Sequence, residues 1–222
     1  NILKKERNFI ADSAHELRSP LTALKVQLEV AQMSADNPAA IKESLHKLEQ
    51  GIDRSTHLVE QLLAFSRIET GLNALPRDNV LLDWRQIAAQ IKDECAPTAA
   101  AKQITVCEEI SGPPPFQNGN PVWAALMLRN LVDNAVKYSP AGANVTITIK
   151  DGEISVCNSD TTVDPEQLKH LGQRFYRPAG QKIDGSGLGL SIVAKIASVY
   201  HCRTDCANTR DGFCVTIRPQ TK

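Results

Sequence analysis

The sequence has few aromatic residues and no excess of either charge. Phe, Trp and Tyr make up 5% of the 222 residues, and 25 basic side chains are balanced by 25 acidic ones. A neutral chain lacks the broad positive surface with which proteins bind nucleic acids or anionic membranes nonspecifically. Any phosphate group that this protein binds must therefore be held by local contacts.

Long apolar runs are also missing. No stretch approaches the roughly 20 apolar residues that a membrane-spanning helix needs, and no charged-then-apolar leader opens the chain. With 42% apolar and 23% charged residues, the composition is that of a folded protein with one large or two small domains. Because the chain begins at Asn1 without Met, we expect a soluble piece of a longer protein, whose remainder could hold a membrane segment.

The sequence has six cysteines but no C-x-x-C pair. Cys107, Cys157 and Cys214 each stand in an alternating apolar stretch, which predicts a place on the buried face of a strand. We therefore interpret the cysteines as small buried hydrophobes of a protein in a reducing compartment. The alternative is a metal or disulfide site built from Cys202, Cys206 and Cys214. Beyond His201, the sequence offers no convincing fourth ligand for a metal there.

The first 70 residues carry a heptad pattern. Apolar residues recur every seven positions at Leu3, Ile10, Leu17, Leu24 and Ala31. A second series, four positions further on in the heptad, contains Ala14, Leu21 and Leu28. After a turn-rich break at 34–38, the pattern resumes at Ile41, Leu45, Leu48, Ile52, Ser55, Val59 and Leu62. This spacing predicts a hairpin of two long helices. Because one hairpin buries a single seam, we expect a homodimer that closes a four-helix bundle.

The remaining chain has mixed periodicity. Residues 71–79 contain Gly, Pro and Asn without a period, which predicts a linker. Alternating stretches predict strands at 80–82, 104–110, 145–149, 154–156, 203–207 and 213–217, and apolar-periodic stretches predict helices at 84–95, 122–136 and 188–199. Asp151-Gly152 is typical of a two-residue hairpin turn. The order predicts an α+β domain in which helices cover a mixed sheet.

The segment from Ala14 to Pro20 is unusual for a helix interior. Pro20 costs about 3 kcal/mol there, because it removes a backbone hydrogen bond and crowds the carbonyl of Glu16. His15 falls one step outside the heptad seam, so we expect it to be exposed. A neutral imidazole is nucleophilic, and a neighbouring carboxylate can accept a hydrogen bond from its second ring nitrogen. The alternative is a surface histidine beside a kink.

Two further segments are suited to phosphate. Asn130, Asn134 and Lys137 share one helix face, where amide oxygens suit Mg²⁺ and the ammonium group suits phosphate, although they could simply form a polar outer face. A glycine-rich loop, DGSGLG at 184–189, leads into a predicted helix, so its N–H groups can approach phosphate oxygens. It lacks the Gly-Lys-Ser/Thr of a Walker motif. The RFYR segment at 174–177, ahead of a polar loop, is typical of a lid.

Taken in order, these segments resemble the cytoplasmic catalytic core of bacterial two-component sensor histidine kinases. HELRSPL at 15–21 is similar to the H-box of the family, residues 130–138 to its N-box, residues 174–177 to its F-box and residues 185–190 to its second glycine box. The resemblance spans nearly the whole chain and is strongest to the QseC-type quorum-sensing sensors. It implies a dimerisation and histidine-phosphotransfer domain at 1–70, the linker at 71–79, and a catalytic ATP-binding domain of the Bergerat, or GHKL, type at 80–222.

The resemblance also implies roles for the matching residues. His15 would accept the phosphoryl group of ATP at Nε2, with Glu16 as general base, and would pass it to an aspartate of a response-regulator receiver domain. Ser19 would hold the water that hydrolyses the phosphorylated partner, and Arg177 would meet the γ-phosphate charge. Mg²⁺ would bind at Asn134. The nucleotide would contact Asn130, Asn134, Lys137, Tyr138, Asn158, Phe175, Gly185, Gly187, Leu188 and Gly189.

The implied setting is the cytoplasmic portion of a bacterial inner-membrane protein. The resemblance implies a homodimer with a receiver domain as partner. It implies no nucleic-acid partner, and a membrane attachment only through a sensor segment outside this chain.

One segment departs from the family pattern. The first glycine box of the family reads Asp-x-Gly-x-Gly, and its aspartate accepts a hydrogen bond from the adenine amino group, whereas this chain has NSDTT at 158–162. Asn158 is a neutral acceptor, and charged acceptors bind about twice as strongly. We therefore keep a nucleotide-poor or phosphatase-biased member of the family as an alternative. A coiled-coil adaptor whose second domain binds a protein, and a GHKL ATPase of the chaperone or topoisomerase sort, are further alternatives.

Overall fold

The computed structural model describes residues 2–33, 37–70, 80–177 and 186–220. The chain divides into two compact units, Asn1–Arg67 and Ile68–Lys222. Within the described residues, every helix is too short or too polar to cross a membrane.

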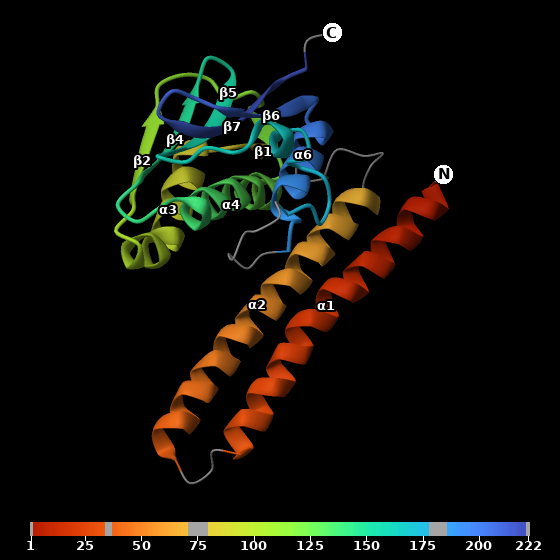
Figure 1. Cartoon of the computed structure of the whole chain (residues 1–222). Helices are drawn as coiled ribbons and strands as arrows, with labels where there is room; N and C mark the ends of the chain where they lie inside the picture. The colour runs from red at the N-terminus through yellow and green to blue at the C-terminus, as the bar shows by residue number, and fades with distance from the viewer. Residues whose placement is uncertain (1, 34–36, 71–79, 178–185, 221–222) are drawn as a thin grey trace. The chain divides into compact units, whose positions relative to one another are not determined.

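Unit 1 is a helical hairpin of α1 (Ile2–Met33) and α2 (Pro38–Thr70), as the heptad pattern predicts (Figure 1). Asn37 caps α2, because its Oδ1 accepts hydrogen bonds from the backbone N–H groups of Ala39 and Ala40 at 3.1 and 3.2 Å. Helix α1 continues through Pro20. Two residues further on, the Thr22 hydroxyl donates to the Arg18 carbonyl at 2.9 Å.

Among the heptad positions of unit 1 whose burial the structure describes, about half are at least partly buried. Those that are at least partly buried recur every seven residues, at Leu17, Leu24 and Ala31 in α1 and at Ile41, Leu48, Ser55 and Leu62 in α2. The other set also recurs every seven residues but is exposed, with exposed fractions of 41–58%, at Leu21, Leu28, Leu45, Ile52 and Val59. We call this second set the exposed heptad positions. The hairpin alone therefore leaves a regular apolar surface in water.

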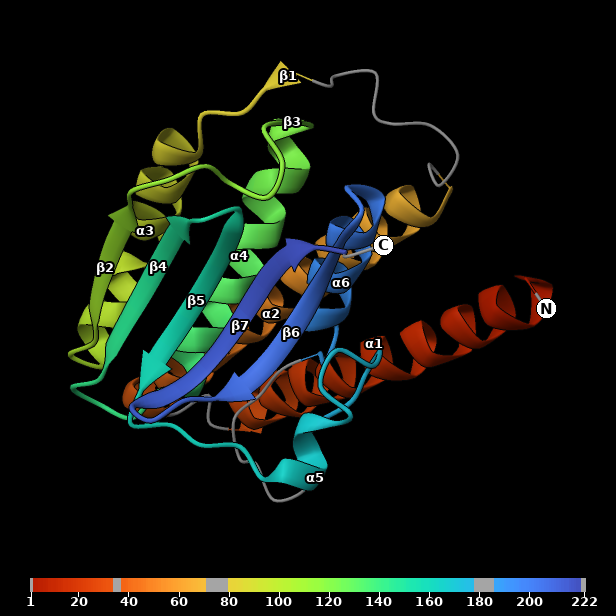
Figure 2. The ribbon, with the colours of Figure 1, turned by 90° about the horizontal axis from the view of Figure 1, so that it is seen from above.

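Unit 2 is a five-stranded sheet with helices on one face (Figure 2). The strand order is β2 (Thr105–Ile110), β4 (Asn144–Lys150), β5 (Glu153–Ser159), β7 (Gly212–Pro219) and β6 (Cys202–Asn208), and only the β2–β4 pair is parallel. The covering helices are α3 (Trp84–Ala101), α4 (Pro121–Tyr138) and α6 (Gly189–Val199). The turn from β4 to β5 has positive φ at Asp151 (54°) and Gly152 (77°), as a type I′ turn requires.

Helix α4 is the centre of the core of unit 2. It packs against α3, α6, β4 and β5. The fully buried side chains of this core include Met127, Leu128, Leu131, Ile147 and Ile192. Each such residue contributes about 1.5–3 kcal/mol by burial, so the position of α4 is determined by several independent contacts.

Both ends of α4 are fixed by polar side chains. At its start, Oδ1 of Asn120 accepts hydrogen bonds from the N–H groups of Val122 and Trp123 at 2.9 and 3.2 Å. At its end, the Lys102 ammonium donates to the carbonyls of Val136 and Lys137 at 3.1 and 2.6 Å. A cation at a helix C-terminus also offsets the partial negative charge there. The last turn of α4 is thus held in one position.

The predicted α+β order is confirmed, with longer helices than the sequence indicated. Helix α3 runs six residues beyond the predicted end at Cys95, through Pro97 to Ala101. Two small features were not predicted: the pairing of β1 (Val80–Leu81) with β3 (Asn118–Gly119), and the short helix α5 (Pro165–Leu168). The predicted linker at 71–79 lies outside the described residues.

The prediction for the cysteines is wrong in part. Cys157 and Cys214 form a disulfide between directly paired positions of β5 and β7, with Cα atoms 4.1 Å apart. The helix-covered face takes Val156 and Val215 instead, because neighbouring residues of a strand point to opposite faces. Cys107 is exposed.

The C-terminal cysteines do not gather into a metal site either. Within the described residues, no group of His, Cys, Asp and Glu could hold a metal ion, and Cys214 bonds to Cys157. Cys202 and Cys206 carry free thiols, and burial raises the pKa of each to about 11. These two thiols are therefore protonated near neutral pH and behave as packing groups.

Reduction of the disulfide should destabilise unit 2. The two cysteines are 57 residues apart, so we expect the free energy of unfolding to fall by about 2–4 kcal/mol when the unfolded chain regains its freedom. Urea unfolding followed by tryptophan fluorescence measures this change, because Trp84 and Trp123 both lie in unit 2. A double variant, Cys157→Ser with Cys214→Ser, should not respond to dithiothreitol. Equal stability of the parent in both conditions would contradict the prediction.

Candidate functional site

The asparagine pair of α4 lies against the first residue of α6. A Cβ atom at Gly189 would lie 3.0 Å from Oδ1 of Asn130 and 3.0 Å from Nδ2 of Asn134, closer than nearly all real Cβ contacts. Asn130 is 4% exposed, and its Nδ2 donates to the carbonyl of Leu126 at 2.8 Å, which fixes the amide. A side chain at position 189 would push the two amides back by a few tenths of an ångström.

The start of α6 has no side-chain cap among the described residues. Its N-cap residue, Leu188, makes no side-chain capping hydrogen bond, so the first N–H groups of the helix lack that partner. Leu188 is fully buried, and its carbonyl accepts a hydrogen bond from the Ser191 hydroxyl at 2.8 Å. The N–H groups at a helix start and the partial positive charge there suit an anionic oxygen, and the nearby amide oxygens suit a hard cation.

The RFYR segment is bonded to the glycine-rich loop. The N–H of Phe175 donates to the carbonyl of Gly187 at 3.1 Å. Gly187 has a φ of +68°, and a Cβ atom there would lie 2.7 Å from the carbonyl carbon of Phe175. These contacts bring the predicted lid segment and the predicted phosphate loop together. Gly185 and the rest of 178–185 lie outside the described residues.

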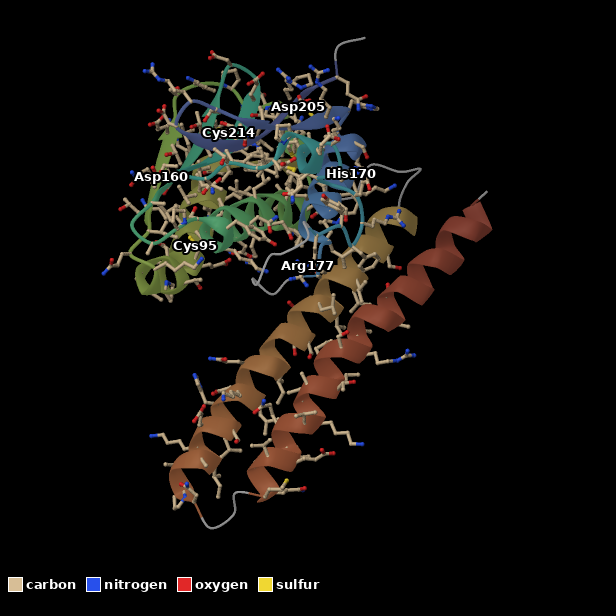
Figure 3. All side chains as sticks on the ribbon, viewed as in Figure 1. Cys95, Asp160, His170, Arg177, Asp205 and Cys214 are labelled. Atoms are coloured by element: carbon tan, nitrogen blue, oxygen red, sulfur yellow. A yellow bond between two sulfur atoms is a disulfide. The ribbon has the colours of Figure 1, made fainter. Side chains whose placement is uncertain are left out.

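Arg177 lies near the end of α4. The Lys137 ammonium is 5.6 Å from the centre of the Tyr138 ring. Burial raises the pKa of the Tyr138 hydroxyl, and the positive charge of Arg177 partly opposes the rise, so the guanidinium is within electrostatic range. Figure 3 shows Arg177 on the helix side of unit 2 and Cys214 at the sheet. The three residues place positive charge beside a half-buried aromatic ring.

Asn158 is a buried polar residue on the helix-covered face of β5. It is 3% exposed, and its Nδ2 has no hydrogen-bond partner in the part of the chain that the structure describes. Gly212 of β7 approaches its backbone so closely that a Cβ atom would lie 1.9 Å from the Asn158 carbonyl oxygen. Buried polar groups are nearly always satisfied in native proteins, by protein, water or ligand.

After Asn158 the backbone adopts a positive φ, which usually requires glycine, at a residue that is not glycine. Asp160 has a φ of +57°, and its N–H donates to the carbonyl of Asp211 at 3.0 Å. Asp is one of the few residues that tolerate the left-handed region. The Asp160 carboxylate accepts a hydrogen bond from the Ser159 hydroxyl at 2.6 Å, and Thr162 is exposed. The substituted segment therefore keeps an ordered turn, with the side chains of Asp160 and Thr162 in solvent.

The remaining predicted site residues lie on α1. Ser19 is exposed there. His15 and Glu16 are helical in their backbone, and their side chains lie outside the described part of the structure.

Sequence reasoning missed two supporting residues. Lys102 holds the last turn of α4 from 34 or more residues away, and no local pattern indicated it. Gly212 is required behind Asn158, and only its place in an Asp-Gly turn could have suggested a constrained glycine.

Comparison with known proteins assigns a family to this arrangement. Residues 5–71 match the model of the His Kinase A (phospho-acceptor) domain, and residues 119–222 match that of the histidine kinase-, DNA gyrase B- and HSP90-like ATPase. Sensor protein QseC of Salmonella typhi is 41% identical over 212 residues, which are 96% of this chain. The chain belongs to the sensor histidine kinases. The corresponding protein of Escherichia coli K12 is 42% identical to this histidine kinase over an alignment of 220 residues, which covers 95% of the chain.

Solved histidine kinases share the fold. The cytoplasmic segment of QseC has a TM-score of 0.53 at 27% identity, covering 77% of this chain and 95% of that one. The histidine kinase ThkA, in complex with the response regulator protein TrrA, has a TM-score of 0.72 at 19% identity and covers 96% of this chain and 61% of that one. This kinase chain spans about half the length of its curated relatives, 47% for the Salmonella typhi protein and 46% for the Escherichia coli one.

The Gly187 contact can be tested against a matched glycine. Gly152 also has a positive φ, but nothing lies within 4 Å of the Cβ position there. Gly152→Ala should therefore cost only the strain of a left-handed alanine, about 1–2 kcal/mol. Gly187→Ala should cost about 1–3 kcal/mol more, because its methyl group overlaps the Phe175 backbone. Urea unfolding measures both changes. Equal losses in the two variants would show that the overlap is relieved without cost.

Proposed function

We propose that this chain is a kinase core that transfers the γ-phosphoryl group of Mg-ATP to His15 and then to an aspartate of a response-regulator receiver domain. The observation that carries the proposal is the contact between the start of α6 at Gly189 and the amides of Asn130 and Asn134. It combines amide oxygens, which suit a hard cation, with the partly positive N-terminus of a helix, and a Mg-triphosphate requires both.

The described residues fit such a ligand. The Asn158 amide has an unused donor, and the absence of a side chain at Gly189 leaves the helix start open to the amide pair. Asn134 would hold Mg²⁺ beside Asn130, Lys137 and Arg177 would meet phosphate charge, and Tyr138 would pack on the nucleoside. Phe175, Gly185, Gly187 and Leu188 would form the closing segment over it. Bound Mg-ATP supplies the phosphoryl group.

His15 and Glu16 would carry the transfer on α1. Nε2 of His15 bonds to phosphorus while the bond to the β-phosphate oxygen breaks, and the proton on Nδ1 passes to the Glu16 carboxylate. A phosphohistidine formed in this way then serves as the donor to the receiver aspartate.

The exposed heptad positions support a homodimer. They are apolar, regularly spaced and in water in the single hairpin, with Ile52 at 54% and Leu45 at 56%. A second copy would cover them in a four-helix bundle, since the same pattern recurs on both helices. Likeness to the QseC sensors supports a place in the cytoplasmic portion of a bacterial membrane sensor. The ThkA complex supports a response regulator as partner.

A phosphatase-biased role is the second candidate. Two observations favour it: Asn158 replaces a charged acceptor in a buried position, and Ser19 is exposed one turn beyond His15, where its hydroxyl can bind a water. In that case the chain would mainly dephosphorylate its partner.

Autophosphorylation can be measured directly. Incubation with Mg²⁺ and γ-labelled ATP should give a protein label that is labile in acid and stable in alkali, as a phosphohistidine is. His15→Gln should abolish the label. His46→Gln should retain it, because that histidine is exposed on α2 and is not the proposed acceptor. A label that survives in His15→Gln would contradict the role of His15. An unlabelled parent that dephosphorylates a receiver domain would favour the phosphatase role.

The dimer can be tested with two charge substitutions on α2. Ile52→Glu should shift the chain from dimer to monomer in analytical ultracentrifugation, because a carboxylate would enter the apolar seam. Gln50→Glu adds the same charge at an exposed position on the opposite side of the helix and should leave the dimer intact. A parent that sediments as a monomer would contradict the proposed assembly.

A further inference from the structure

The Asn158 amide offers a donor where the sheet is otherwise apolar. Ile154 and Val156, on the same face of β5, are buried and apolar, while Nδ2 of Asn158 is buried without a partner among the described residues. Buried N–H groups are nearly always satisfied in native proteins, by protein, water or ligand. This donor is unused but covered in the structure, so it reaches a bound molecule only when the amide turns about χ2.

The topology places this amide at the end of the sheet where α4 terminates. Asn158 pairs with Val145, the second residue of β4, and β4 begins shortly after α4 ends at Tyr138. Helix α4 also packs on β5. The amide therefore lies at the same end of unit 2 as the half-buried Tyr138 ring and the phosphate-binding residues proposed above.

An amide and a carboxylate select different purines. A carboxylate only accepts hydrogen bonds, so it favours a base with an amino group at C6 and repels one with an oxygen there. An amide presents Oδ1 to an amino group or, after half a turn about χ2, Nδ2 to an oxygen. Since no described protein group holds Nδ2, no hydrogen bond from that atom fixes the Asn158 amide in one orientation.

The geometry points to a relaxed base specificity: the nucleotide site of this chain takes 6-oxopurine nucleoside triphosphates as well as ATP, with Nδ2 of Asn158 donating to the C6 oxygen. The inference rests on the proposed function, because it requires that a purine base contacts Asn158. One neutral hydrogen bond is exchanged for another of similar strength, so the affinities should differ by no more than about threefold.

Inosine triphosphate is the suitable probe. It differs from ATP at the C6 substituent and the adjoining ring nitrogen, whereas GTP adds a second amino group. Isothermal titration of the whole chain with each triphosphate in Mg²⁺ should give dissociation constants within about threefold. Asn158→Asp should favour ATP by about tenfold or more, because the C6 oxygen would face a carboxylate. Asn144→Asp, an exposed change at the start of β4, should leave the ratio as in the parent.

Each outcome distinguishes this inference from the proposed function. A parent that binds ATP more than tenfold tighter than inosine triphosphate overturns the inference and leaves the proposed function in place. An unchanged ratio in Asn158→Asp overturns the role of Asn158. A chain that binds neither triphosphate overturns both proposals. If Asn158→Asp fails to fold, the ratio measured with the parent still decides.

Discussion

Unit 2 depends on a single helix that must be apolar on one side and polar on another. Helix α4 packs against two helices and two strands, and its ends are held by Asn120 and Lys102. These contacts leave it little freedom to shift or rotate. The amides of Asn130 and Asn134 therefore meet Gly189 at contact distance, and a displacement of a few tenths of an ångström would open or close that contact. The packing of the core thus sets the geometry of the candidate site.

Periodicity predicted the large elements and failed for small ones. The heptads of α1 and α2 and the alternation in β4 and β5 extend over enough residues to define a face. The two-residue strands β1 and β3 and the four-residue α5 are too short for a period. The cysteine prediction failed for a different reason. Cys157 lies in the same strand as Ile154 and Val156, but at an odd-numbered position. Because side chains alternate between the two faces of a strand, it lies on the face opposite to theirs.

The candidate site was predictable where its residues are close in sequence. Asn130, Asn134 and Lys137 are spaced so that they lie on one face of a helix, and the glycine-rich segment directly precedes α6. What joins these segments is long-range: the contact of Gly189 with α4 and the bond between Phe175 and Gly187 depend on tertiary packing. The unused donor of Asn158 could not be predicted at all. Whether a buried amide is satisfied depends on every neighbouring atom.

The exposed heptad positions of unit 1 also have a consequence for the cell. In the proposed homodimer, their apolar side chains would leave water when two chains meet, so part of the folding free energy of the hairpin would be an association free energy. By mass action, the ordered fraction of α1 and α2 then rises with the local density of chains. A protein present in few copies reaches a higher local concentration when those copies are held on one surface, because they are then not diluted into the whole volume.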